Sequence, residues 1–305
     1  MKKIIQYLRE FVRRPRFVWE LLGGLAFSLV ALWLNESWGG ESIWIDGSAT
    51  QAARLLKYLA LYATAFGGGY LLQIAIHPTE KGLRSGRLWT GVVVAVVLFS
   101  VRAWFQPYPL IRDRIPPEYQ TVVWKYLYNG GGLVWLALPT LLFWWISGDF
   151  RRLPPYGFSA KHASLKPYFI LLGLMLIPLL WAAQQPDFQE MYPRAAHIDL
   201  PPGGPYNTLL TALYETVYSL DYVVTEFFFR GFLILHFARF AGEKVILPMC
   251  MFYVVIHFDK PIAEAVSSFF GGMILGVLAL RTRSIYGGII VHLGIALLME
   301  ALGLL

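Results

Sequence analysis

The chain has 305 residues, of which 57% are hydrophobic, 16% aromatic and only 15% charged, and its mean hydropathy is +0.53. A soluble domain has about 45–50% apolar and about 25% charged residues, so this composition excludes an ordinary water-soluble protein. The formal net charge of +7 is spread over several loops rather than gathered in one patch, so the sequence predicts membrane lipids and no nucleic acid as partners.

Long apolar stretches predict the fold class, an all-α, polytopic integral membrane bundle of about nine transmembrane helices. A helix needs about 20 mainly apolar residues to cross the hydrocarbon core. In chain order the candidate stretches are 17–34, 58–76, 88–106, 126–147, 168–183, 207–235, 245–258, 262–280 and 284–305. The seventh is short, and the sixth is long enough to form two helices joined at a bend.

Lys and Arg residues alternate between rich and poor loops along the chain. The rich segments are 1–16, 77–87, 149–166, 239–244 and 281–283, whereas the only charged residues of 35–50 are acidic. With nine spans, the rich segments all fall on the side of the N-terminus, which the positive-inside rule places in the cytoplasm. We therefore expect an integral protein of the cell membrane with a cytoplasmic N-terminus and no cleaved signal, because the first apolar run is too long for one.

The predicted regions differ in how many ionisable residues lie within their apolar stretches. Residues 1–166 are expected to form an N-terminal membrane region of about four spans. Residues 167–305 are expected to form a second membrane domain with its motif-bearing core at 207–305. Ionisable groups inside lipid-spanning helices are rare and face one another or an internal cavity. The first five spans hold almost none, and their triple glycines (67–69 and 130–132) are expected to allow close packing or kinks.

Three of the last four stretches carry ionisable residues that predict a site. Glu226 and Arg230 are i,i+4 and can pair along one helix, while His257 and His292 follow in separate stretches. Counted from the predicted cytoplasmic helix ends, Glu226, His257 and His292 lie about 21, 20 and 13 Å deep. These related depths favour one proton-transfer or metal-binding set. The simpler alternatives are a structural ion pair and packing histidines.

Two further carboxylates are candidates for supporting roles. Asp221 is i,i+4 from Thr225 and shares its helix face, unless it is a residue of a bend or a cavity mouth. Glu264 follows Pro261, which is expected to begin the eighth helix. Glu264 is expected either to hydrogen-bond His257 and close the outer side of the site, or to be a solvated first-turn residue stabilised by the helix dipole.

The motifs EFFFRG (226–231), HFDKP (257–261) and RTRSI (281–285) leading to His292 resemble the CPBP family of CAAX prenyl proteases and bacteriocin-processing or bacteriocin-immunity membrane proteins. The family pattern is E-E-x-x-x-R, then F-x-x-x-H, then H-x-x-x-N or D, and the resemblance covers about the last hundred residues. It implies an intramembrane endopeptidase whose site opens to the cytosol. Glu226 matches the second glutamate, Arg230 the arginine, and His257 and His292 the two histidines.

Three positions depart from the family pattern. Thr225 replaces the first glutamate, which the family uses as the base, and threonine is no general base at neutral pH. Ala296 replaces the Asn or Asp after His292 and has no side-chain donor. Tyr253 stands where the pattern has Phe.

The sequence thus predicts a CAAX-protease-like peptidase that cleaves a peptide or membrane-protein substrate at the cytoplasmic side of the membrane. Glu226 would be the general base with His257, His292 would polarise the carbonyl oxygen, and Arg230 would orient Glu226. No cofactor or metal is predicted, with zinc as the alternative, since two His and one Glu are a plausible ligand set.

Two other functions are weighed against this prediction. The first is a catalytically silent CPBP-like protein that binds a membrane protein or a lipidated peptide, which Thr225 and Ala296 favour. The second is a transporter with a Glu–His proton relay. The sequence shows no inverted repeat or matched pair of broken helices, which argues against transport.

Overall fold

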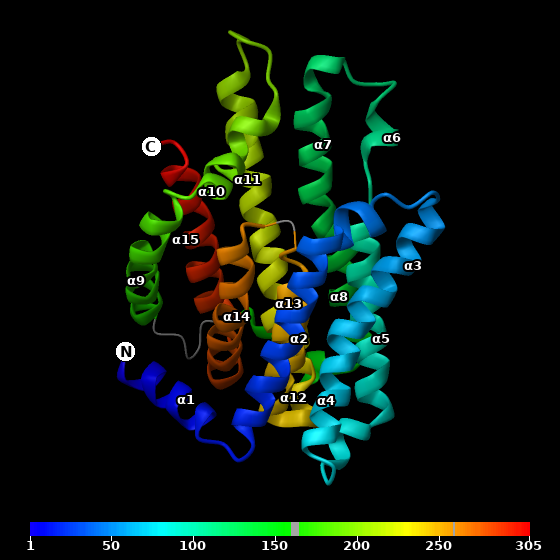
Figure 1. The fold of residues 1–305 in the computed structure, drawn as a ribbon, viewed down its shortest axis with the longest axis vertical. Coiled ribbons are helices and arrows are strands. Elements are labelled where there is room, and N and C mark those ends of the chain that lie inside the picture. Colours follow the sequence, from blue (N-terminus) through cyan, green and yellow to red (C-terminus); the bar gives the residue numbers. More distant parts are fainter. Residues whose placement is uncertain (160–164, 259) are drawn as a thin grey trace.

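The structure is a computed structural model that describes residues 1–159, 165–258 and 260–305. All regular elements in these ranges are helices (Figure 1). Lys161 of one predicted basic loop and Asp259 of the second motif lie outside the described residues. The all-α fold class predicted from the apolar stretches is therefore confirmed for the described part of the chain.

The α-helices are α1 (Lys2–Val12), α2 (Phe17–Trp38), α3 (Gln51–Tyr62), α4 (Gly68–Ile76), α5 (Gly86–Trp104), α6 (Tyr108–Ile111), α7 (Pro117–Gly132), α8 (Leu138–Ile146), α9 (Lys166–Ala182), α10 (Pro186–Met191), α11 (Asn207–Glu226), α12 (Ala238–Ala241), α13 (Ile246–Val255), α14 (Ile262–Thr282) and α15 (Tyr286–Leu302). The π-helical segments are η1 (Gly40–Ile45), η2 (Ala63–Gly67), η4 (Leu133–Ala137) and η8 (Phe227–His236). The 3₁₀ segments are η3 (Lys81–Arg84), η5 (Asp149–Arg151), η6 (Pro155–Gly157), η7 (Arg194–Ile198) and η9 (Gly242–Val245).

Five helices of the described chain are long and apolar enough to cross a membrane by length and composition. They are Phe17–Trp38, Gln51–Ile76, Gly86–Trp104, Pro117–Ile146 and Ile262–Thr282, and a sixth is counted if Lys166–Ala182 and Pro186–Ile198, which are bent by 102°, form one span. The protein is an integral membrane protein on these grounds. Helices also form at the other predicted stretches, but nine crossings stay a prediction.

The apolar helices differ in which surfaces they bury. α2 leaves Trp19 and Trp33 more than half exposed, as expected of side chains that face lipid. In contrast, every residue of α13 and of η8 is buried. α13 packs against α2, α4 and α14, and η8 packs against α11, α14 and η6, so the segments that carry the motifs form the centre of the molecule.

This central packing joins both predicted regions of the chain in one hydrophobic core. In Figure 1, α2, α11 and α13 lie near the middle of the view, with α9 and α15 toward one side and α3 and α5 toward the other. The triple glycines contribute to the close packing. A Cβ at Gly69 would lie 2.6 Å from Cα of Pro248 in α13, so α4 and α13 can touch only because residue 69 has no side chain. The division of the chain at residue 166 stays a prediction.

The connections between helices gather at two ends of the bundle (Figure 1). The α1 end contains α1 and the connections 13–16, 77–85, 147–157, 237–245 and 283–285. The α10 end contains α6, α10, η1 and the connections 39–50, 105–116 and 183–206. The C-terminus lies on the side of the α10 end.

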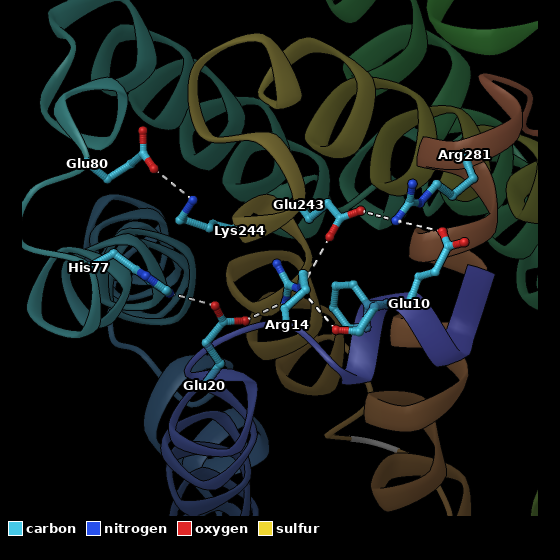
Figure 2. A network of polar contacts seen from close by, with 9 residues as sticks. Glu10, Arg14, Glu20, His77, Glu80, Glu243, Lys244 and Arg281 are labelled. Carbon is cyan, nitrogen blue, oxygen red and sulfur yellow. Dashed lines mark hydrogen bonds and ion pairs between the residues drawn. The ribbon is translucent and has the colours of Figure 1, made fainter. Parts of the chain in front are cut away.

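A network of ion pairs at the α1 end links the first two helices to the motif-bearing part of the chain, as Figure 2 shows. The buried carboxylate of Glu20 in α2 is 2.7 Å from both Arg14 and His77. The other pairs are Arg14–Glu243, Arg281–Glu243, Arg281–Glu10 and Lys244–Glu80. Residues far apart in the sequence are thus held together at this end.

Candidate active site

Glu226 is the last residue of α11 and lies just before the π-helical segment η8. The local sequence FFFRGF places four phenylalanines in the core within ten buried residues. π-Helical turns are rare and occur often at functional sites. The Glu226 side chain is fully buried, and its carboxylate is 3.1 Å from Nη1 of Arg230, an ion pair across one helical turn. The i,i+4 pairing expected from the sequence is present.

His292 of α15 is the second partner of Glu226. Its Nδ1 is 2.9 Å from Oε1 of Glu226, and its side chain is 15% exposed. A carboxylate oxygen only accepts, so Nδ1 carries the hydrogen and Nε2 is left with a lone pair when the ring is neutral. The helices can approach this closely because residue 288 is glycine, where a Cβ would overlap Oε2 of Glu226.

Tyr253 of α13 contacts Arg230, His257 and His292, which together with Glu226 form what is called the Glu–His set below. Its hydroxyl is 3.1 Å from Nε2 of His292, and its ring centroid is 4.6 Å from that of His257. The Arg230 guanidinium lies 4.1 Å from the centroid of the Tyr253 ring. The Tyr253 carbonyl accepts a hydrogen bond of 2.6 Å from Nδ1 of His257. This bond fixes the neutral tautomer of His257 with its lone pair on Nε2.

A cavity of about 510 Å³ lies against this set. His257, His292, Tyr253 and Thr225 line it, whereas Glu226 does not. The two imidazoles and the phenol hydroxyl therefore face the space available to a substrate. Glu226 is linked to the cavity wall through its contact with His292.

The structure pairs Asp221 with a residue that the sequence did not single out. Asp221 lines the cavity and forms an ion pair of 3.2 Å with Arg102 of α5, whose guanidinium also lies 4.5 Å from the ring centroid of Tyr128. α7 approaches Asp221 closely, since a Cβ at Gly132 would overlap its carboxylate. Asp221 is thus a charged residue of the cavity wall, one turn from Thr225.

Glu264 also lines the cavity, in the first turn of α14. It accepts a hydrogen bond of 3.0 Å from the hydroxyl of Tyr192 and lies 3.6 Å from Nζ of Lys260. These partners, and not His257, hold its carboxylate. Its side chain is 22% exposed, so it is neither fully solvated nor part of the buried set.

Ala296 lies one turn after His292 in α15 and is buried. It offers no polar group beside His292, and Thr225 offers only a hydroxyl at the cavity wall. Tyr253 was the residue that sequence reasoning missed as a site member. Its departure from the Phe of the family pattern was the signal that could have identified it.

The described residues contain no group of three or more His, Cys, Asp or Glu side chains arranged to hold a metal ion. The Nδ1 atoms of both histidines are engaged, that of His257 with a backbone carbonyl and that of His292 with Glu226, and the Glu226 carboxylate does not line the cavity that the two rings line. The arrangement does not fit the three-ligand zinc site considered from the sequence.

The fold and the site together define a helical integral membrane protein with a buried Glu–Arg–His set beside an internal polar cavity. Residues 201–298 match the family model described as Rce1-like, Type II CAAX prenyl endopeptidase. The matched segment contains Glu226, Arg230, His257 and His292, so the similarity to the CAAX protease family that the motifs predicted is confirmed. Comparison with curated proteins gives no match, and neither does comparison with solved structures.

Proposed function

We propose that the protein is an intramembrane endopeptidase that hydrolyses peptide bonds by water activation at the Glu–His set. The observation that carries the proposal is the fully buried Glu226 carboxylate, held by Arg230 at 3.1 Å and by His292 at 2.9 Å beside a cavity. A buried charge is costly within a membrane bundle, so such a set is a functional site by default. The family match supports a peptide substrate.

In this proposal His257 takes the proton from the attacking water. Its Nε2 has a free lone pair because Nδ1 donates to the Tyr253 carbonyl, and the ring lines the cavity. The water oxygen bonds to the carbonyl carbon, and the water proton passes to Nε2. When the C–N bond breaks, His257 returns this proton to the leaving amine, so that an acid and an amine are formed.

The hydroxyl of Tyr253 would stabilise the oxyanion of the tetrahedral intermediate. The hydroxyl contacts Nε2 of His292, whose Nδ1 contacts Glu226, so a chain of hydrogen bonds runs from the cavity to the buried carboxylate. The contact with Glu226 orients the His292 ring beside the tyrosine hydroxyl, which would turn from Nε2 to donate to the substrate oxygen. Tyr253 would thereby supply the donor that Ala296 lacks.

This assignment changes one role that the sequence suggested. Glu226 was expected to be the base toward water, but it does not line the cavity. We therefore assign it a positioning role through His292. Arg230 holds the carboxylate in place from one turn further along the helix.

The alternative function is a catalytically silent member of the family that binds a membrane protein or a lipidated peptide. It is favoured by Thr225, which leaves the cavity wall without the first glutamate of the family motif. The two functions differ in whether peptide bonds are broken.

The deciding experiment compares membrane proteomes of a deletion strain, a Glu226→Gln strain and a His257→Gln strain with that of the parent. A peptidase predicts that the same uncleaved precursors accumulate in all three. If precursors accumulate only in the deletion strain, the protein acts by binding. A cleavage assay on one such precursor then separates the roles: we expect the pH–rate profile to shift in Glu226→Gln and the rate to be lost at every pH in His257→Gln.

We further propose nine membrane crossings with the α1 end in the cytoplasm, supported by the Lys and Arg residues gathered there. Cleavage at the cytoplasmic side, which the family resemblance implies, would require the substrate to reach the Glu–His set from the α1 end.

A further inference from the structure

The active-site cavity extends toward the α10 end of the bundle. Its wall includes residues of the connections at that end, namely Glu41, Asp46, Gln106 and Arg194, together with Lys260 of the connection between α13 and α14. Arg54 and Tyr58 come from the start of α3, and Phe99, Arg102 and Ala103 from the end of α5, which are the parts of these helices nearest the same end. One side of α11, from Tyr214 to Thr225, continues the wall down to the Glu–His set. No residue of the connections at the α1 end lines it.

Packed side chains close the route from the α1 end to the site. All ten residues of η8 lie between Glu226 and that end, and all are buried. Closer to the α1 end, Asp149 accepts hydrogen bonds from His236, Tyr156 and Arg239. These bonds link the connection after α8 to the end of η8. The ion pairs of Figure 2 join the surrounding connections. Among the described residues, the cavity beside the Glu–His set has no wall residue from the connections of this side, and packed side chains lie between them.

The charge of the connections gives the two ends different sides of the membrane. The α1 end carries most of the Lys and Arg residues: Lys2, Lys3, Arg9, Arg13, Arg14, Arg16, Lys81, Arg84, Arg87, Arg151, Arg152, Lys166, Arg239, Lys244, Arg281 and Arg283. The connections of the α10 end carry only Arg112, Arg114 and Arg194, and Lys260 follows α13. The helix segments toward this end add Arg54, Lys57, Arg102 and Lys125, so the α1 end is still the richer in Lys and Arg. Short loops rich in Lys and Arg stay in the cytoplasm.

From these two observations we infer that the cavity opens on the side of the membrane away from the cytoplasm and receives a hydrophilic peptide segment exposed there. The choice of a peptide rests on the proposed function, whereas the side of the opening does not. The substrate would be an extracytoplasmic segment of a membrane or exported protein. The direction of access is opposite to the one that the family resemblance implies.

The chemistry of the cavity wall favours a polar peptide over a lipid chain. Three ion pairs lie along it: Arg54–Asp46, Arg102–Asp221 and Lys260–Glu264. Tyrosines from several helices supply further hydroxyl groups, at Tyr58, Tyr62, Tyr128, Tyr214, Tyr218 and Tyr222. An apolar chain in this space would desolvate charged groups without replacing their hydrogen bonds, whereas a peptide backbone offers both donors and acceptors.

The inference is tested by cysteine labelling in sealed membrane vesicles of known orientation. The only cysteine of the chain, Cys250, is buried, so the unmodified protein is the unlabelled control. Asn129→Cys reports on the cavity wall, Asp113→Cys on the α10 end and Lys81→Cys on the α1 end. Each is treated with a charged maleimide that does not cross membranes.

We expect Asn129→Cys and Asp113→Cys to be labelled in right-side-out vesicles and Lys81→Cys only in inside-out vesicles. Labelling of Asn129→Cys from the same side as Lys81→Cys would overturn the direction of access. Labelling of Lys81→Cys in right-side-out vesicles would overturn the orientation. Failure of the charged reagent to reach Asn129→Cys from either side, while Asp113→Cys reacts, would overturn the hydrated cavity. Labelling needs no catalysis, so these results are independent of whether the protein cleaves peptides.

Discussion

At the scale of single residues, the site depends on how a fully buried carboxylate is satisfied. Glu226 has a cation on its own helix, Arg230, and a ring nitrogen from another helix, His292. Removing one partner of a buried charge pair usually costs about 3–5 kcal/mol, because the remaining charge stays uncompensated. Substitutions that disturb the packing around Glu226 should therefore reduce stability or activity even at positions that have no catalytic role.

Gly288 is the clearest such position. We expect Gly288→Ala to abolish cleavage, because its methyl group would overlap the Glu226 carboxylate and push it away from His292. Gly271→Ala is the matched control, since a Cβ there meets no atom within 4 Å and the substitution is in another apolar helix. Cleavage assays and thermal melting of both purified variants provide the measurement. Equal activity in the two variants would contradict the packing of α15 against Glu226.

Tyr253→Phe tests the hydroxyl without disturbing the rings. The variant keeps the contacts with Arg230 and His257 and loses only the hydroxyl that faces His292. If the hydroxyl stabilises the oxyanion, we expect kcat to fall about 10²–10³-fold with little change in KM and an unchanged melting temperature. Full activity would show that Tyr253 is a packing residue.

At the scale of elements, η8 is held at its far end by a polar cluster outside the predicted spans. Asp149 is buried and is held by His236, Arg239 and Tyr156. Burial by itself raises the pKa of Asp149, but the hydrogen bond and charge of His236, with Arg239 and Tyr156, outweigh it and hold the pKa below its ordinary value. The charged form is therefore the one that stabilises the fold.

The sign of the pH dependence follows from this lowered pKa. The stabilisation from Asp149 is complete above its unfolded pKa of about 3.9 and is lost as the pH falls through the lower folded value. We expect Asp149→Asn to lower the unfolding free energy by about 3 kcal/mol at pH 7, and to remove this part of the acid sensitivity. Melting of the detergent-solubilised protein from pH 3 to 7 measures both effects. Asp113→Asn, whose side chain is 79% exposed, is the control and should leave the curve unchanged.

At the scale of the whole molecule, the network in Figure 2 joins the N-terminal helices to the motif-bearing part of the chain. Glu20 is its most buried carboxylate, since its side chain is 4% exposed and contacts both Arg14 and His77. Glu10 lies at the edge of the same network, with a side chain 44% exposed and a longer contact of 3.5 Å to Arg281. The two glutamates thus allow a comparison within one network.

We expect Glu20→Gln to lower the unfolding free energy by about 3 kcal/mol, because Arg14 would lose its buried partner. Glu10→Gln should cost less than about 1 kcal/mol, as is usual for an exposed ion pair that salt screens. Thermal melting at low and high salt distinguishes the two variants. Equal losses would mean that the network contributes as a whole rather than through its buried member.

The sequence by itself determined the all-helical membrane class and the approximate positions of the helices, because hydropathy is a local property of the chain. It also determined the Glu226–Arg230 pair, since residues four apart meet on any helix. The order and spacing of the motifs with His257 and His292 were sufficient to predict the family similarity.

Only the tertiary structure decided which residues meet across helices. It paired Glu226 with His292 and set Tyr253 between His292 and His257. Likewise, it gave Asp221 a partner in α5 and Glu264 a partner in the segment after α10. These contacts depend on the rotation and approach of helices that lie far apart in the sequence, and no local spacing encodes them. The position of the cavity toward the α10 end also depends on helix packing, because its wall is made of residues from helices that lie far apart in the sequence.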